Sequence, residues 1–597
     1  MKDFFRSLLA SLVALVLFVG GGLVLVVGVM FALSSGKPAV APRSVLLLNL
    51  STNFPESVQD PNPAGLIQRV VGGSEAEALP LAGVLQALDR ASRDRTISAL
   101  DLTGNLAPQG YGSGPAALKE LREAILKFRA DSGKPVIAYN HMWTKWEYYL
   151  CSGASTLYVN PSGEVDCTGM SAEPMFFGGA LKKYGVEVQV TRVGKYKSAV
   201  EPYILDKMSD ASREQLTALF SDIWEDWKGA VAADRKLTVA EVQALSDEKG
   251  EMTGPEALKA GLVDKLATPD QVLDELKLLA GRKASDPDFP QVDLDTYMRI
   301  PVPVQGRNRI AMVFAEGEIV DGNGRAGQVG GERLSRELRQ LRLDPQVKAI
   351  VLRVNSPGGS ALASDLIQRE VILARKVKPV VVSMGYLAAS GGYWISTYGD
   401  RIFAEPNTIT GSIGVYGMLP NVQKLANEHG ITWDTVQTSK LANVTTVTRP
   451  KSPAELVRIQ GLVDTIYDQF LTRVADSRRM SKDQVNEIAQ GRVWSGRQAL
   501  KAGLVDEMGG IQDAIRFAAK RAKIEGDYWV DPPLEPRTPV ERILKLLNGG
   551  EDRGISQAEV GPAEQLRSRF EQVLGTFDAL NDPRGVYARM PFDFNLR

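Results

Sequence analysis

The stretch AIVLRVNSPGGSALASDLIQREVILARKVKPVVVSM, residues 349–384, decides the fold. Its first apolar run, Ala349–Val354, predicts a buried β-strand, and residues 361–376 have a helical pattern. A second apolar run, Val380–Met384, predicts another strand. Strands that alternate with helices are typical of β-α-β units and a parallel sheet, so the stretch predicts an α/β fold.

The same pattern occurs twice along the chain. The string ALKAGLVD stands at residues 257–264 and again at residues 499–506. Lys134-Pro135 and Lys378-Pro379 likewise correspond, each before an apolar run. The offset between the copies drifts because insertions collect in surface loops. The sequence therefore predicts two tandem α/β repeats that arose by internal duplication.

We expect the first repeat over residues 46–281 and the second over residues 309–525. Residues 282–308 are rich in Pro, Asp and Gly, which predicts a linker. The tail, residues 526–597, has apolar residues at helical spacing between Leu566 and Leu580. This spacing predicts a helical tail that packs on the body, with a second membrane contact as the alternative.

The N-terminal residues 1–45 contain a long apolar run. Residues 8–33 carry no charge and number 26, whereas a helix needs about 20 residues to cross a bilayer core. We expect a retained transmembrane helix in contact with membrane lipid. A cleaved signal peptide is the alternative, because small residues follow at 34–36. Lys2 and Arg6 favour a cytoplasmic N-terminus, which would place the remainder on the extracytoplasmic side of the inner (plasma) membrane.

Composition argues against some classes of function. The 70 Lys+Arg and 71 Asp+Glu leave a net charge of −1, which gives no electrostatic basis for nucleic-acid binding. The two cysteines, Cys151 and Cys167, form no metal-ligand cluster, and we expect neither a metal nor an organic cofactor. Both are expected to be buried free thiols, and a single disulfide is the alternative.

Three motifs could carry chemistry. The glycine turn Asn355–Gly359 follows a predicted strand, where exposed backbone N–H groups can bind an oxyanion. In TGSIGVYG, residues 410–417, Ser412 stands between glycines that let a substrate backbone approach. The third motif is GKYKSAVEP, residues 194–202. Taken alone each is weak, since most such segments are ordinary turns or basic loops.

The duplication strengthens the interpretation that these motifs form a functional site. Alignment of the two copies places Met170 opposite Ser412, and Ala442 opposite Lys197. The glycine turn corresponds to a segment that starts at Asn105 and lacks the double glycine. The first copy thus keeps a lysine, whereas the second keeps the serine and the turn. This division predicts one site shared between the copies.

The scarcity of histidine narrows the mechanism. The chain has two, His141 and His429, neither has a counterpart in the other copy, and we expect both to be structural. A lysine amine is then the plausible base for a serine hydroxyl. The amine must be neutral, so its pKa must fall from about 10.4, which burial beside apolar surface achieves.

At this point the residues resemble a known family, signal peptide peptidase A in its long form, over about residues 45–525 and the anchor. The matching strings are RVGKYKSAVEP (192–202), VNSPGGS (354–360), AASGGYWIS (388–396) and TGSIGVYG (410–417). The resemblance implies two tandem repeats similar to the crotonase and caseinolytic-protease fold after a transmembrane helix. It also implies a serine endopeptidase, assembled as a homotetramer, that degrades signal-peptide remnants and other hydrophobic peptides without a cofactor.

The resemblance also implies the site residues. Ser412 matches the family nucleophile and Lys197 the family general base. Gly358 and Gly359 match the glycines of the family turn, so one of their N–H groups and that of Ile413 would form the oxyanion hole. Whether one chain or two neighbouring chains complete the dyad stays open.

Ser390 is the alternative nucleophile, because it starts a predicted helix just after a strand. The family match favours Ser412, and Ser390 is then expected to cap its helix or to pack near the site. Two rival functions also stay open. A crotonase-type enzyme for acyl-CoA thioesters is disfavoured by the anchor and the dyad, and a non-catalytic membrane scaffold is disfavoured by the intact second copy.

Overall fold

The computed structural model describes residues 40–57, 77–301, 306–531 and 586–590. The predicted anchor, residues 8–33, and the predicted tail helix, residues 566–580, lie outside the described residues. Within the four described ranges, no helix is long and apolar enough to cross a membrane.

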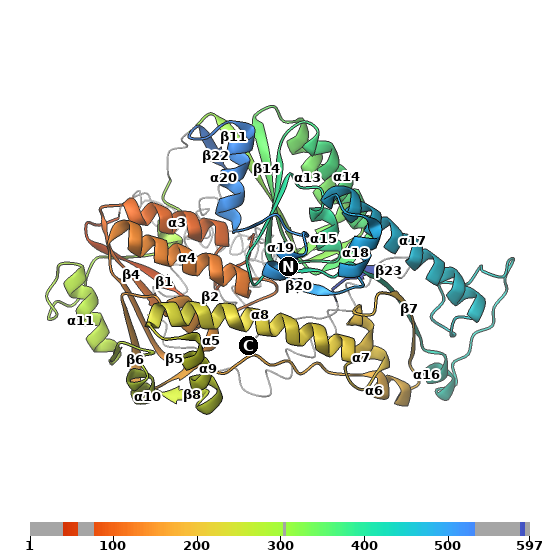
Figure 1. The fold of residues 1–597 in the computed structure, drawn as a ribbon, viewed down its shortest axis with the longest axis horizontal. Coiled ribbons are helices and arrows are strands. Elements are labelled where there is room, and N and C mark those ends of the chain that lie inside the picture. The colour runs from red at the N-terminus through yellow and green to blue at the C-terminus, as the bar shows by residue number, and fades with distance from the viewer. Residues whose placement is uncertain (1–39, 58–76, 302–305, 532–585, 591–597) are drawn as a thin grey trace, which may run out of the picture.

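The first repeat is a mainly parallel sheet with helices on both faces (Figure 1). Its strands are β1 (Ser44–Asn49), β4 (Ile97–Thr103), β5 (Val136–Trp143), β6 (Thr156–Asp166), β8 (Glu251–Thr253), β9 (Lys265–Leu266) and β10 (Gln291–Asp293). They lie in the order β10-β1-β4-β5-β6-β8, with β9 beside β6. Its helices include α3 (Leu81–Arg93), α4 (Pro115–Ser132), α5 (Lys145–Cys151), α9 (Val239–Glu248), α10 (Gly254–Lys259), α11 (Pro269–Leu279) and α12 (Leu294–Met298).

The second repeat has the same topology. Its strands are β11 (Asn308–Glu316), β14 (Val347–Ser356), β16 (Val380–Ala389), β17 (Arg401–Ala404), β18 (Ile409–Gly411), β20 (Val493–Ser495), β21 (Glu507–Met508) and β22 (Tyr528–Val530). They lie in the order β22-β11-β14-β16-β18-β20, with β17 beside β16 and β21 beside β17. Its helices include α13 (Gly331–Leu343), α14 (Ala361–Arg375), α15 (Gly391–Ser396), α18 (Lys482–Ile488), α19 (Gly496–Lys501) and α20 (Ile511–Ala522). The predicted duplication and α/β class are confirmed.

The stretch that decides the fold forms the predicted β-α-β unit, β14, α14 and β16. The two strands are parallel, with Ile350 opposite Val380 and Val354 opposite Met384. β16 runs five residues past the predicted end, to Ala389, and all ten of its residues are buried. A central parallel strand is covered on both faces, so its sequence is apolar without alternation. This is why the serine and glycine inside it did not end the strand.

Strands of the sheets also lie in the segments predicted as linker and tail. The predicted linker, residues 282–308, contains β10, which extends the first sheet by pairing with β1, and α12, which packs on that edge. The tail after residue 525 contributes two strands that its apolar pattern did not indicate. β22 extends the second sheet beside β11, and β23 (Val586–Arg589) inserts into a third sheet.

A long arm of the first repeat crosses to the second. The arm contains α6 (Gly178–Lys183), β7 (Glu187–Val193) and α7 (Glu201–Ile204), and α8 (Asp210–Arg235) leads back along the base of the molecule (Figure 1). β7 pairs antiparallel with β19 (Val415–Asn421) of the second repeat over seven residue pairs. The third sheet therefore mixes both copies and the tail, in the order β13 (Gln328–Gly330), β12 (Glu318–Val320), β15 (Gly358–Ser360), β23, β19 and β7.

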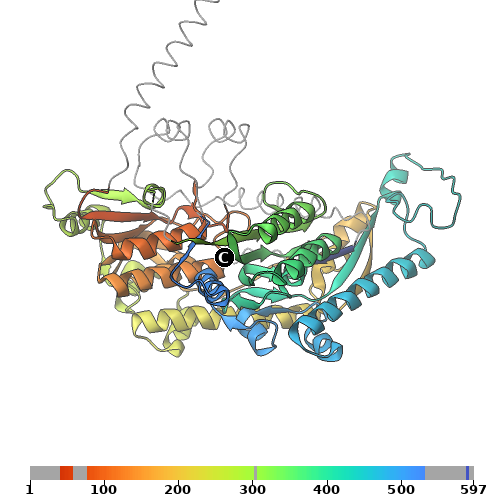
Figure 2. The ribbon, with the colours of Figure 1, turned by 90° about the horizontal axis from the view of Figure 1, so that it is seen from above.

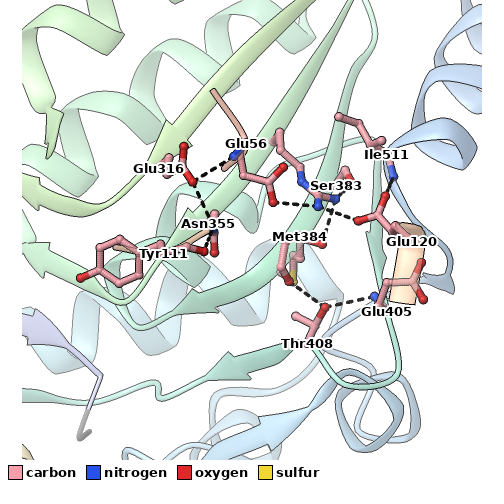
Figure 3. A network of polar contacts seen from close by, with 12 residues as sticks. Glu56, Tyr111, Glu120, Glu316, Asn355, Ser383, Met384, Glu405, Thr408 and Ile511 are labelled. Atoms are coloured by element: carbon pink, nitrogen blue, oxygen red, sulfur yellow. Dashed lines mark hydrogen bonds and ion pairs between the residues drawn. The ribbon is translucent and has the colours of Figure 1, made fainter. Parts of the chain in front are cut away.

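A buried cluster of charges also joins the repeats (Figure 3). Arg353 of β14 is fully buried and donates to Glu56 at 2.8 Å and to Glu120 at 2.6 Å, both from the first repeat. Glu120 also accepts from the backbone N–H of Ile511 at 2.7 Å. Desolvation raises the pKa of both carboxyl groups, and Arg353 opposes this rise. The arginine is therefore what permits two carboxylates in this interior.

Arg353→Met should destabilise the folded chain by about 3–5 kcal/mol, because it leaves two buried carboxylates without their cation. The control is Arg375→Met, whose partner Asp400 pairs with it at a surface where Arg375 is 40% exposed. That change should cost less than about 1 kcal/mol. Urea unfolding of both variants measures the difference, and equal midpoints for the two would contradict the proposed importance of Arg353.

Candidate active site

Ser390 lies at a sharp turn between β16 and α15. Its backbone has φ 56° and ψ −113°, a conformation that a residue with a side chain adopts at a cost of about 1–3 kcal/mol. The Ser390 N–H donates to the Gly411 carbonyl at 2.8 Å, which holds the turn. Of the two expectations for Ser390, the cap is wrong, since the side chain makes no cap hydrogen bond to α15, and packing near the site is confirmed. The turn directs the hydroxyl elsewhere, into the buried centre between the repeats.

Ser412 follows β18 and is also buried. Its φ is 50°, and its N–H donates to the Arg492 carbonyl at 2.7 Å. β18 lies beside β16, with Ala388 opposite Thr410 and Ala389 opposite Gly411. This register brings the residues that follow the two strands, Ser390 and Ser412, to the same end of the sheet.

Lys197 of the crossing arm reaches both serines. Its Nζ lies 2.8 Å from Ser390 Oγ, 3.0 Å from Ser412 Oγ and 3.0 Å from the Ser412 carbonyl oxygen. All three residues belong to one chain. The structure thus brings together Lys197 and Ser412, as the sequence predicted, and adds Ser390 as an equally close neighbour.

The lysine is enclosed and poorly solvated. Its side chain is 0% exposed. A methyl group built on Gly491 would lie 2.7 Å from Lys197 Cβ, and one on Gly414 would lie 3.2 Å from Lys197 Cδ, so the two glycines make room for its stem. Burial lowers the pKa of Lys197 well below its ordinary value, and the nearby Arg589 lowers it further. Burial therefore disfavours the charged form of this amine.

The backbone around Lys197 is clamped to the second repeat. The Tyr196 N–H donates to the Gln490 carbonyl at 2.9 Å, and the Tyr196 carbonyl accepts from Gln215 Nε2 of α8 at 2.9 Å. Gln215 Oε1 in turn accepts from the Val493 N–H at 3.2 Å. These contacts fix the lysine relative to the serines independently of the dyad itself.

The glycine turn lies beside the Ser390 turn. Gly358 and Gly359 have φ of 98° and 152°, and they begin β15. A methyl group on Gly358 would lie 2.6 Å from the backbone nitrogen of Gly391, the residue after Ser390. The turn is therefore close to Gly391. Ile413, the other residue predicted for the oxyanion hole, is fully buried in the core of the second repeat, and its carbonyl accepts a hydrogen bond from the Gly491 N–H.

Asn355, the first residue of the glycine turn, contacts the first repeat (Figure 3). Its side-chain amide donates to the Tyr111 carbonyl of the first repeat at 2.9 Å, and its Oδ1 accepts from the Leu387 N–H at 3.1 Å. The turn is thus tied to both repeats and to β16. Sequence reasoning missed this inter-repeat role, because no pattern near Asn355 indicates a partner 244 residues away.

The equivalent place in the first copy cannot act in the same way. Trp146 and Met170 stand where Ser390 and Ser412 stand in the second copy. The Leu106 N–H, in the loop that replaces the glycine turn, donates to the Glu147 carboxylate at 2.6 Å. Burial raises the pKa of Glu147 to about 7. The Leu106 N–H of this loop is therefore already hydrogen-bonded to a side chain of the protein, the Glu147 carboxylate.

The remaining candidate groups lie away from this site. His429 is the residue at which α16 (Gln423–Glu428) ends, with its Nδ1 2.8 Å from the Leu425 carbonyl, and His141 packs edge-on against Tyr139. Cys151 and Cys167 are buried free thiols, so the alternative of a disulfide is wrong.

Both repeats match a known family of peptidases. The model of peptidase family S49 matches residues 129–283 and again residues 372–525. The chain therefore belongs to peptidase family S49, and it is a serine protease. Protease 4 of Salmonella typhi is 34% identical over 98% of this chain and 96% of its own length. The chloroplastic serine protease SPPA of Arabidopsis thaliana is 32% identical over 84% of this chain and 72% of its own.

A solved structure, a ClpP1 mutant of Listeria monocytogenes, is 19% identical and covers 34% of this chain and 94% of its own, with a TM-score of 0.24. A similarity of this size does not establish a common fold. The two α/β repeats stand on the sheets described above, and the likeness to the crotonase and caseinolytic-protease fold stays a prediction.

The buried lysine should make stability depend on pH. Because the pKa of Lys197 is lower in the folded state, the unfolded state binds more protons, and stability attributable to this group rises with pH up to the unfolded value of about 10.4. Lys197→Met removes this dependence. Between pH 7 and 9.5, the wild type should gain stability relative to Lys197→Met, by at most about 1.4 kcal/mol per pH unit. Urea unfolding across this range measures the difference.

Lys195 provides the matched control, since it is exposed two residues away. The difference between the wild type and Lys195→Met should stay constant over the same pH range. A wild type that loses stability relative to Lys197→Met as the pH rises would show that Lys197 is charged in the folded protein.

Proposed function

We propose that this protein is a membrane-anchored endopeptidase that degrades cleaved signal peptides and other hydrophobic peptides with a serine–lysine dyad shared between its repeats. The observation that carries the proposal is the fully buried Lys197 of the first repeat, 2.8–3.0 Å from two serine hydroxyls of the second. A neutral amine in that position can activate a hydroxyl. Apolar residues on and around β19, among them Tyr416 and Met418 of the strand and Val200 beside it, favour apolar peptides.

Within this proposal, Ser390 is the nucleophile, although the sequence favoured Ser412. Ser390 sits on a strained strand-to-helix turn, the arrangement that presents a nucleophile in many hydrolases. It also stands next to Gly391, whose N–H lies beside the glycine turn. Ser412 then orients Lys197, because its carbonyl can only accept a hydrogen bond and so fixes one N–H of the neutral amine.

The proposed reaction follows from these positions. Lys197 takes the proton of Ser390 Oγ as the oxygen attacks the scissile carbonyl. The N–H groups of Gly359 and Gly391 stabilise the oxyanion, with Gly391 in the role that the sequence assigned to Ile413. The protonated lysine gives its proton to the leaving amine, and water then hydrolyses the acyl-enzyme.

Replacement of each serine separates the two roles. Ser390→Ala should abolish both peptide hydrolysis and covalent labelling by a fluorophosphonate probe, because it removes the attacking oxygen. Ser412→Ala should keep labelling but slow it, roughly 10–100-fold, because Lys197 loses its hydrogen bond to Ser412 Oγ while the Ser412 carbonyl and the Ser390 nucleophile remain. Labelling that persists in Ser390→Ala and vanishes in Ser412→Ala would restore Ser412 as the nucleophile.

The anchor and the location form part of the same proposal. The uncharged run of residues 8–33 supports a single retained transmembrane helix, with the catalytic repeats on the extracytoplasmic side of the inner (plasma) membrane. Extraction of membranes with alkaline carbonate tests retention. Release of the full-length chain into the soluble fraction would count against the anchor.

Assembly into a homotetramer is also proposed. By alignment, residues 432–438 correspond to β7 and residues near 172–178 correspond to β19. The first segment is entirely exposed, including Trp433 and Val436, and no residue of the second is buried. The segment and α17 (Pro453–Arg478) project from the body in both views (Figures 1 and 2). The strand pairing that joins the two repeats within a chain would thus recur between chains. Chains joined head to tail in this way would close into a ring.

Light scattering of the detergent-solubilised protein should give about four times the chain mass of 64.9 kDa, after correction for detergent. Val436 is 97% exposed, and Val436→Asp should shift the protein toward the monomer by placing a charge in the contact. Val377→Asp, at a residue 64% exposed on another face, is the matched control and should keep the mass. A wild type that is an active monomer would rule out the ring.

A further inference from the structure

Residues 490–492, which lead into β20, contact both halves of the proposed dyad. The carbonyl of the first of them accepts from the N–H of Tyr196, the residue directly before Lys197, at 2.9 Å. The carbonyl of the last, Arg492, accepts from the Ser412 N–H at 2.7 Å. This short segment is therefore the place where the lysine and Ser412 are held against one another through the backbone.

The side chain of Arg492 reaches back to the crossing arm. Its guanidinium carbon lies 4.8 Å from the centre of the Tyr196 ring and 4.5 Å from the centre of the Trp494 ring. Its Nη1 donates to the Tyr196 hydroxyl at 3.1 Å and pairs with Glu214 of α8 at 2.9 Å. The Tyr196 hydroxyl donates to the same carboxylate at 3.0 Å. A guanidinium suits this place because it stacks on rings and binds a carboxylate at the same time.

The cluster is partly shielded from solvent. Tyr196 is 6% exposed, and the side chain of Arg492 is 20% exposed. The Trp494 indole donates to the Ile488 carbonyl at 2.9 Å, which fixes the second ring beside the guanidinium. Rings that cover a cation reduce the screening of its charge by salt and water. The contact between Arg492 and Tyr196 is therefore stronger than an open surface pair.

The cluster accompanies the dyad and not the general fold of a repeat. The alignment of the two copies places residues that can make none of these contacts opposite its three polar members, namely Leu441 for Tyr196, Val457 for Glu214 and Gly250 for Arg492. The alignment is well fixed here, since α8 and α17 are both 26 residues long. The copy that has lost the serines thus also lacks the arginine.

We propose that Arg492 is a positioning residue, whose side chain holds Tyr196 and thereby keeps Lys197 at the distance from the serines that proton transfer needs. The inference rests on the proposed function. The main chain of Arg492 holds Ser412 whatever its side chain is, so the side chain contributes the link to the arm. Without that link the arm keeps only its other contacts, and a displacement of about 1 Å can slow a reaction by up to about 100-fold.

Steady-state kinetics of Arg492→Ala test the proposal, with the full-length protein in detergent and fluorescein-labelled casein as substrate. kcat should fall about tenfold while KM changes less than about twofold, because a misplaced base slows the chemical step and not substrate binding. Labelling by the fluorophosphonate probe should slow by the same factor. Arg492→Lys should restore kcat to within about threefold of the wild type, since an ammonium group also lies favourably over a ring.

Arg497→Ala is the matched control. Arg497 likewise joins the second repeat to α8, through Asp222 at 3.1 Å and Asp226 at 3.0 Å. Its loss should lower the urea midpoint about as much as Arg492→Ala does and leave kcat unchanged. An equal fall of kcat in both variants would make Arg492 a mere contact between repeats and overturn the inference. A raised KM at unchanged kcat would assign Arg492 to substrate binding and overturn it as well.

The route through Tyr196 has its own test. Tyr196→Leu should lower kcat about as much as Arg492→Ala, and the double variant should be no slower than either single one, because residues that act as a unit are not additive. Effects that multiply in the double variant would overturn this route.

Glu214→Gln decides the question even if Arg492→Ala does not fold, because the side chain is 55% exposed and its size is kept. It should lower kcat about threefold by weakening the hold on Arg492. Glu225→Gln, 56% exposed on the same helix and paired with Lys228, should leave kcat unchanged. Equal kcat values for these two variants would overturn the inference.

The wild type separates this inference from the proposed function. A wild type that neither hydrolyses casein nor takes the label would overturn the proposed function, and the role of Arg492 with it. An active wild type beside a folded Arg492→Ala variant of equal kcat would overturn the role of Arg492 alone.

Discussion

The antiparallel pairing of β7 with β19 is the contact on which the rest of the site depends. It carries Lys197 out of the repeat that encodes it and into the repeat that carries Ser390 and Ser412. Because the ladder is made of backbone groups, it fixes the position of the lysine without using any residue that the chemistry needs. Arg353 and its two carboxylates join the repeats at a second place, so the arm closes on a partner whose position is already set.

This arrangement explains how the candidate active site can contain residues whose conformation or burial costs free energy. A buried lysine loses hydration, and a serine with positive φ is strained. Both persist because the surrounding contacts over-determine them: Tyr196 is held by Gln215 and Gln490, and the Ser390 N–H is held by Gly411. The free energy of the two sheets and of their interface thus maintains a desolvated lysine and a hydroxyl in reach of it.

The sequence predicted the fold well and the site in part, for physical reasons. Apolar runs and an internal string repeated 242 residues apart reveal two α/β repeats, because buried parallel strands leave a pattern that local sequence records. The division of lysine and serine between the copies indicated a shared site. The choice between Ser390 and Ser412 was beyond such reasoning, because it depends on backbone angles and on which N–H groups face a substrate. Likewise β10 and β23 are short strands whose positions are fixed by distant partners, and three or four residues hold too little pattern to predict a strand.

The crossing arm also has an evolutionary consequence. When a site draws its base from one copy and its nucleophile from the other, covalent fusion of two identical copies creates two sites, of which one suffices. Selection then no longer maintains the serines in the first copy or the lysine in the second, and Trp146, Met170 and Ala442 stand at those positions. Once both losses have occurred, neither half alone encodes a complete centre. The fusion has become irreversible, and the linker between the repeats can no longer be lost without loss of the enzyme.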